Sequence, residues 1–212
     1  MKIKETYKNI SSKIRERKKL IVIISLIFTI LFALYNRIIG AINKSLWHES
    51  ISIYYFILVL IKSIILIYIS KSKNRSKDNI IFYLTKTLLF LLNISLIIPI
   101  VLMILNKRIV KMSFIFSIAI ALYVTIKTTK SIVLFIKRRK EKDVLLKELK
   151  VIDLIDSVIS ILTLQNTLIS INSNEISLEL HYITFISSFL GLIFNLYLII
   201  NLKIYRKSIH KK

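Results

Sequence analysis

Long apolar runs alternate with short polar segments along the whole chain of 212 residues. The runs are continuous in Ile, Leu, Phe and Val, which is typical of membrane-crossing helices and not of barrel strands. Lipid offers the backbone no hydrogen-bonding partners, so such runs must be helical. The pattern therefore predicts an all-α, polytopic transmembrane helix bundle of about six spans. The predicted spans are 20–42, 50–69, 80–105, 112–136, 151–171 and 180–202.

Basic residues gather between alternate spans, in segments that we call the basic segments. These are 1–19, 70–78, 137–150 and 203–212, and together they hold most of the 33 Lys and Arg residues. Lys and Arg favour the cytoplasmic side of a membrane, so both termini are predicted to be cytoplasmic. Apolar residues at helical spacing within 1–19 predict a helix lying on the inner membrane surface, with a disordered basic arm as the alternative.

The formal net charge of +22 would suggest nucleic acid as the partner of a soluble protein. Here the basic residues flank apolar runs, which instead favours contact with a lipid bilayer carrying anionic head groups, and we expect no nucleic-acid partner. The expected head-group contacts are Lys18, Lys19, Arg138, Arg139 and Lys140. Abundant lysine and isoleucine suggest an AT-rich bacterial genome, and hence a bacterial cell membrane as the location.

Ionisable side chains inside the spans are the main candidates for chemistry, because a charge in the hydrocarbon layer is costly. Lys130 and Asp156 each lie roughly 10 Å from the basic segment that separates the fourth and fifth spans. If these two spans are neighbours, the two residues are expected to form an ion pair, with Lys127 one turn deeper. Two alternatives remain open: the lysines are also placed to extend toward head groups, and an ion pair here would also serve a purely structural role.

The fifth span also carries a polar stripe on one helical face. Its members are Asp156, Ser160, Thr163, Thr167 and Ser170, at steps of four and three residues. Such a stripe indicates a face turned toward other helices or a cavity, and interhelical hydrogen bonding is its commonest use. Gln165 lies on the opposite face, so protein is expected on two sides of this span. The predicted polar pocket comprises Lys62, Lys86, Lys127, Lys130, Asp153, Asp156, Ser160, Thr163 and Gln165.

Other patterns predict structural roles. Small residues at helical spacing in the first span (Ser25, Thr29) and the last (Ser187, Gly191) favour close helix packing. Aromatic residues near the outer surface predict a belt at the membrane interface. The expected belt residues are Tyr35, Trp47, Tyr54, Tyr55 and Tyr182.

No motif indicates catalysis, a cofactor or a metal. The sequence contains no H-E-x-x-H, G-x-S-x-G or phosphate-binding loop, and no cysteine. Several His and Glu residues fall near the outer surface, but their spacing matches no ligand motif. We therefore expect a protein that is not an enzyme, with no catalytic residue, no cofactor and no metal site.

Three stretches are distinctive together: residues 43–55 with the basic Lys62, residues 121–127, and residues 155–165. They resemble a family of uncharacterised six-span membrane proteins from low-GC Gram-positive bacteria. The resemblance implies six spans and assigns no activity. It includes positions selected above on physical grounds, namely Tyr54, Tyr55, Lys62, Lys127, Asp156, Ser160 and Gln165.

Two functional hypotheses follow from these patterns. The first is a small permease or transporter-like protein for an anionic solute, because lysines outnumber aspartates in the predicted pocket. The alternative is a membrane adaptor or regulator that docks a cytoplasmic partner or anionic lipid through the basic segments. An enzyme acting on lipids has the least support, since no nucleophile–base set is visible.

Overall fold

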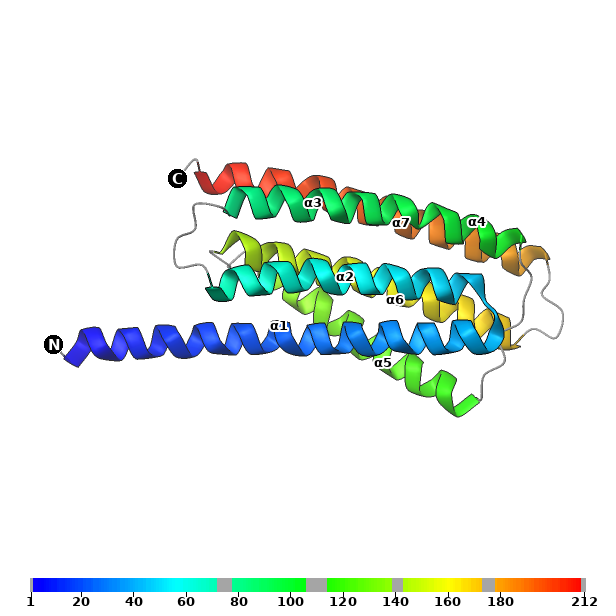
Figure 1. Ribbon diagram of the computed structural model, residues 1–212, viewed down its shortest axis with the longest axis horizontal. Helices are drawn as coiled ribbons and strands as arrows, with labels where there is room; N and C mark the ends of the chain where they lie inside the picture. Colours follow the sequence, from blue (N-terminus) through cyan, green and yellow to red (C-terminus); the bar gives the residue numbers. More distant parts are fainter. Residues whose placement is uncertain (1, 72–77, 106–113, 139–142, 173–177, 211–212) are drawn as a thin grey trace.

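The computed structural model describes residues 2–71, 78–105, 114–138, 143–172 and 178–210. All regular structure in these ranges is helical, which confirms the predicted all-α class. The helices are α1 (Lys2–Asn43), α2 (Leu46–Lys71), α3 (Asp78–Ser95), α4 (Ile97–Leu105), α5 (Phe114–Lys137), α6 (Val144–Asn172) and α7 (Leu178–His210). Figure 1 shows them as an elongated bundle in which successive long helices run antiparallel.

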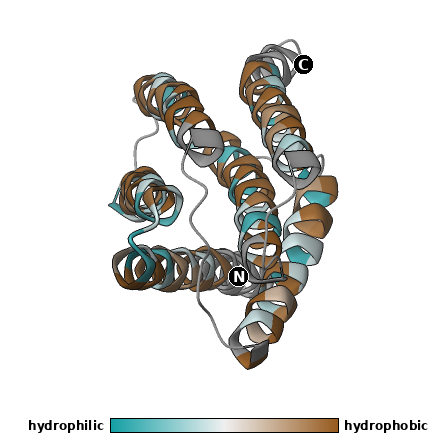
Figure 2. Ribbon diagram, turned by 90° about the vertical axis from the view of Figure 1, so that its right-hand side faces the viewer, coloured by the Kyte–Doolittle hydropathy of each residue, from teal (hydrophilic) through white to brown (hydrophobic). Residues whose placement is uncertain are grey.

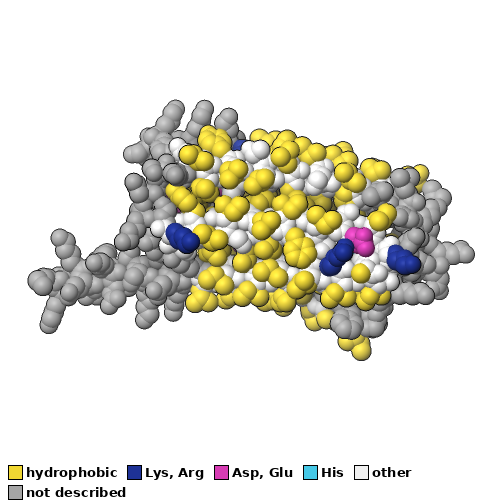
Figure 3. All heavy atoms as spheres, viewed as in Figure 1, with side chains coloured by type: hydrophobic (Ala, Val, Ile, Leu, Met, Phe, Trp, Pro, Cys, Tyr) yellow, Lys and Arg dark blue, Asp and Glu magenta, His cyan; other side chains and the backbone are white. Residues whose placement is uncertain are grey.

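Five stretches of helix are long and apolar enough to cross a membrane. They are Leu20–Asn43, Leu46–Lys71, Asp78–Val101, Ser117–Lys137 and Tyr182–Leu202. Each coincides with a predicted span. Apolar side chains cover most of the face shown in Figure 3, and the few charged side chains visible there lie mainly toward its two ends. That distribution is the one expected of a protein surrounded by lipid.

The predicted fifth span lies in α6, which is not among those five stretches. Polar residues interrupt its apolar sequence, and the helix lies inside the bundle, where it contacts α1, α2, α3, α5 and α7. It runs along the bundle beside its neighbours in Figure 1, and Figure 2 views the same bundle end-on, with hydrophobic residues along most of the helices. The described chain therefore forms six long helices, if α3 and α4 are counted as one broken helix.

The start of α1 and the end of α7 lie at the same end of the bundle in Figure 1. The end of α2, the start of α3, the end of α5 and the start of α6 also lie there. These are the helix ends that adjoin the basic segments. The predicted grouping of basic segments on one side is thus reproduced, whereas their cytoplasmic location stays a prediction.

Helices α1 and α6 begin two turns or more before the expected spans, and α7 ends at His210 instead of 202. Residues 2–19 continue the first span as one helix, α1, of 42 residues, without turning at its start. Helix α6 begins at Val144, two turns before the expected Val151. Asp143 caps it, because its Oδ1 accepts hydrogen bonds from the backbone N–H groups of Leu145 at 3.1 Å and Leu146 at 3.4 Å.

The break between α3 and α4 falls where Pro99 predicts a kink. Proline lacks an N–H group, and its ring clashes with the carbonyl group four residues earlier, here that of Ser95. The helix ends at Ser95 and restarts at Ile97. Leu96 N–H bonds to Asn93 O at 3.2 Å, which tightens the last turn before the break.

Glycines allow two helix pairs to approach closely. At the α1–α2 turn, a Cβ atom on Gly40 would lie 2.9 Å from the backbone nitrogen of Glu49. Lys44 adopts a left-handed conformation (φ 50°), and Ser45 N–H bonds to Gly40 O at 3.0 Å, which closes α1 tightly. Between α6 and α7, a Cβ atom on Gly191 would lie 2.7 Å from Leu162 Cδ1.

Candidate functional site

Four charged side chains meet between α2, α5 and α6, and we call Lys62, Lys127, Asp153 and Asp156 the charge cluster. Lys62 Nζ, on α2, lies 2.8 Å from Asp153 Oδ1 and 2.8 Å from Asp156 Oδ2, both on α6. Lys127 Nζ, on α5, lies 2.6 Å from Asp156 Oδ1. Side-chain exposure is 1% for Lys62 and Asp156, 11% for Lys127 and 12% for Asp153.

The charge cluster is electrically balanced, which accounts for its burial. An isolated charge inside a membrane bundle is strongly unfavourable, and only close opposite charges with further hydrogen bonds offset that cost. Hydroxyl groups on α1 supply such hydrogen bonds. Ser25 Oγ donates to Asp153 Oδ1 at 2.7 Å, and Thr29 Oγ1 lies 3.0 Å from both Asp156 Oδ2 and Lys62 Nζ.

Aromatic rings enclose the ammonium group of Lys127. Its Nζ atom lies 5.0 Å from the ring centre of Phe32, 5.2 Å from that of Tyr55 and 5.8 Å from that of Tyr123. A cation over ring faces at these distances is stabilised electrostatically. Lys127 Nζ also donates to Ser160 Oγ at 2.7 Å. Four helices thus hold this lysine, since the rings come from α1, α2 and α5 and the acceptors from α6.

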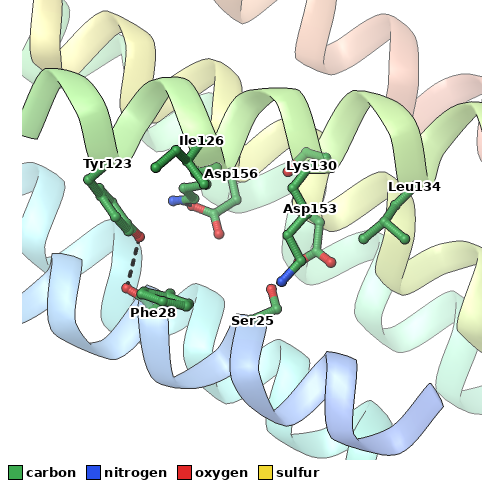
Figure 4. Close-up of a pocket in the computed structure, with 10 residues that line it drawn as sticks. Ser25, Phe28, Tyr123, Ile126, Lys130, Leu134, Asp153 and Asp156 are labelled. Carbon is green, nitrogen blue, oxygen red and sulfur yellow. Dashed lines mark hydrogen bonds and ion pairs between the residues drawn. The ribbon is translucent and has the colours of Figure 1, made fainter. Parts of the chain in front are cut away.

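A cavity of about 190 Å³ adjoins the charge cluster. It lies between α1 and α5, which both pack against α6. Figure 4 shows Tyr123 and Phe28 facing each other across it, joined by a hydrogen bond of 3.1 Å from the Tyr123 hydroxyl to Phe28 O. The lining residues are Ser25, Phe28, Tyr123, Ile126, Lys127, Lys130, Ser131, Leu134, Asp153 and Asp156.

The expected ion pair between Lys130 and Asp156 is wrong. Asp156 pairs with Lys127 and Lys62, while Lys130 is exposed and lines the cavity. Among the residues that the structure describes, Lys130 has no ion-pair partner. Asp156 thus meets the lysine that was expected about one turn deeper, so the predicted matching of depth between α5 and α6 was wrong by about one turn.

None of the other predicted pocket residues lines the cavity, and only Ser160 contacts the charge cluster. Ser160 belongs to the cluster surroundings, since it also bonds to the Tyr55 hydroxyl at 2.9 Å. Thr163 is buried, but its hydroxyl donates to its own helix, to Ile159 O at 2.9 Å. Gln165 and Lys86 do not line the cavity.

Gln165 confirms that α6 has protein on two sides. Its Oε1 accepts a hydrogen bond of 3.1 Å from Ser187 Oγ on α7. Lys86 lies on α3, where it is half-buried, next to Thr85, whose hydroxyl donates to the fully buried Glu148 at 2.5 Å. Glu148 was not predicted, because it stands within the basic segment 137–150, which was expected to contact lipid head groups.

Of the expected head-group contacts, only Arg138 has a described side chain. It is largely buried, with its guanidinium carbon 3.5 Å from the ring centre of Phe135, so its position differs from the exposed one expected. Arg139 and Lys140 lie outside the described residues. Lys18 and Lys19 belong to α1 in a part where only the backbone is described.

The predicted aromatic belt is wrong for three of its members. Trp47, Tyr54 and Tyr55 are buried in the core, whereas Tyr182 is exposed as expected. Their position along α2 suggested the interface, but Tyr55 packs against Phe32 on α1 and Ser160 on α6, and Trp47 lies near Ile100 on α4 and Leu192 on α7. A buried tyrosine needs a hydrogen-bond partner for its hydroxyl group. The polar stripe of α6 offered such a partner in the sequence, and Ser160 is the one that bonds to Tyr55.

A helical bundle with an apolar exterior and an internally neutralised charge cluster defines a multi-pass membrane protein. Its helices contact the lipid bilayer. Comparison with protein-family models, with curated proteins and with solved structures found no match.

Proposed function

We propose that this multi-pass protein is a small permease-like carrier for an anionic solute, with its binding site in the cavity between α1, α5 and α6. The observation that carries the proposal is the exposed residue Lys130 in the cavity wall. The charge cluster next to it is balanced, so Lys130 adds a surplus positive charge. An anion entering the cavity would neutralise a charge that is otherwise costly inside a membrane.

Lys127 is the second ligand that we propose for the anion. It lines the cavity, and 11% of its side chain is exposed. Asp156 would keep Lys62 as a partner at 2.8 Å if Lys127 turned partly toward a solute. Binding would then exchange the ion pair between Lys127 and Asp156 for one between Lys127 and the anion. No charge would be left unpaired in the low-dielectric layer, where an unpaired charge is costly.

The test is anion binding by the purified full-length protein in nanodiscs of uncharged lipid. Inorganic phosphate, sulfate and small carboxylates are screened by thermal shift on the wild type, Lys130→Gln and Lys137→Gln. Lys137 is the matched control, because it lies on the same helix, is exposed and does not line the cavity. We expect stabilisation that Lys130→Gln reduces and Lys137→Gln retains. Equal responses in both variants would exclude Lys130 as a ligand.

We further propose that the protein resides in the bacterial cell membrane with both termini in the cytoplasm, and that it catalyses no reaction. The resemblance to six-span proteins of low-GC Gram-positive bacteria and the clustering of basic segments at one end support this location. The adaptor alternative predicts that neutralising residues 137–140 together abolishes activity, while Lys130→Gln leaves it intact.

A further inference from the structure

The walls of the cavity include side chains that face the lipid. Phe28 on α1 is 42% exposed and Ile126 on α5 is 67% exposed, and both line the cavity. In a bilayer, these exposed apolar groups contact acyl chains. The cavity between α1 and α5 therefore opens sideways toward the hydrocarbon layer, and a ligand is able to enter it from the membrane.

The cation at this opening lies within a membrane-span candidate, Ser117–Lys137 of α5. Lys130 is seven residues from Lys137, the last residue of α5, which corresponds to about 10 Å along the helix axis. Apolar side chains flank it, since Ile126 and Leu134 lie one turn away on either side and line the same cavity. A positive charge framed by apolar surface is complementary to a molecule with an anionic group joined to a hydrocarbon chain.

The size of the cavity limits which part of such a molecule it admits. Sites that enclose a whole drug-sized ligand measure about 300–1,000 Å³. The cavity here measures about 190 Å³, which accommodates a head group but not a complete lipid. The chain of the ligand would remain in the bilayer, against Phe28 and Ile126.

We infer that the ligand is an anionic amphiphile that enters laterally between α1 and α5, with its phosphate or carboxylate group on Lys130 and Lys127. This inference rests on the proposed function. It differs in the route of entry, because the anionic ligand reaches the cavity from the membrane and not from water. Ser131, which also lines the cavity, is a neighbouring hydroxyl group for the same oxyanion. The aspartates of the charge cluster remain paired with Lys62.

The experiment compares three probes on the full-length protein in phosphatidylcholine nanodiscs. Dodecyl phosphate carries both the anion and the chain, inorganic phosphate carries only the anion, and dodecylphosphocholine carries the chain without a net charge. Binding is followed by thermal shift and by native mass spectrometry. The variants are Lys130→Gln, Ile126→Trp to fill the lateral opening, and Leu122→Trp as the matched control. Leu122 is equally lipid-facing, one turn away on α5, and does not line the cavity.

We expect dodecyl phosphate to bind the wild type and Leu122→Trp. It should bind Lys130→Gln at least about tenfold more weakly, as loss of one charged hydrogen bond implies. Ile126→Trp should also weaken binding, because the larger side chain fills the lateral opening. If inorganic phosphate binds as tightly as dodecyl phosphate and Ile126→Trp changes nothing, the lateral route is overturned while the proposed function stands. If dodecylphosphocholine matches dodecyl phosphate, the anionic class is overturned. If neither phosphate probe binds the wild type, both the inference and the proposed function fail.

Discussion

Asp156 holds the charge cluster together, and its replacement by asparagine tests that role. Its two carboxylate oxygens accept from Lys127 at 2.6 Å, from Lys62 at 2.8 Å and from Thr29 at 3.0 Å. Asparagine has nearly the same shape but no charge. Lys62 would still have Asp153 at 2.8 Å, whereas Lys127 would lose the carboxylate that it contacts.

The expected loss follows from which charge is left without a partner. Removing one member of a buried ion pair costs about 3–5 kcal/mol of unfolding free energy, because the other charge stays buried and uncompensated. The aromatic rings around Lys127 remain, so we expect about 3 kcal/mol for Asp156→Asn. Asp153→Asn should cost less, about 1–2 kcal/mol, because Lys62 keeps Asp156 and Asp153 is 12% exposed.

Removing the stranded cation should restore stability. In Asp156→Asn/Lys127→Met, a methionine side chain replaces the ammonium group among the rings of Phe32, Tyr55 and Tyr123. We expect the double variant to be more stable than Asp156→Asn alone, with a coupling of about 2–3 kcal/mol, the upper end for residues in one network.

Reversible unfolding in mixed detergent–SDS micelles, followed by circular dichroism, measures these differences. Lys130→Gln is the matched control, because it removes a lysine from the same cavity without breaking an ion pair, so it should not destabilise the protein. Wild-type stability in Asp156→Asn would refute the reasoning. So would a double variant that is no more stable than Asp156→Asn.

Further predictions concern helix packing and topology. Gly40→Ala should destabilise the protein by about 1–3 kcal/mol, because the added carbon would lie 2.9 Å from the backbone nitrogen of Glu49, which cannot move alone. Gly191→Ala should cost less, since the close atom is the end of the Leu162 side chain; the same unfolding assay compares them, and a reversed order would contradict this. The chain has no cysteine, so a single cysteine added at either end can be labelled in intact cells. Both ends should be protected from impermeant reagent, and labelling of one end alone would refute the even number of crossings.

The four residues of the charge cluster were all among the predicted pocket residues, but the predicted ion pair was wrong. Lys62, Lys127, Asp153 and Asp156 stand out in the sequence because each interrupts an apolar run. Distance along each helix matched Asp156 with Lys130, whereas the structure pairs it with Lys127, one turn further along α5. Which lysine meets which aspartate depends on how α5 is rotated and tilted against α6, and the sequence of either helix alone does not determine that angle.

The hydroxyl and aromatic neighbours of the cluster were harder to foresee. Ser25 and Thr29 follow a small-residue spacing that has many uses, and only the packing of α1 on α6 aims them at the aspartates. Tyr55 was expected at the membrane interface from its position along α2. Its burial follows from the side of α2 on which it lies, which faces Phe32 and Ser160.

The sequence by itself determined the all-α class, the positions of the membrane helices and the grouping of basic segments, because each follows from local hydrophobicity and from the cost of placing charge in lipid. Only the tertiary structure decided that α6 lies inside the bundle, that Lys62 and Lys127 share Asp156, and that a cavity beside Lys130 opens between α1 and α5. These features depend on the relative rotation and tilt of helices, which are set by the packing of side chains far apart in the chain.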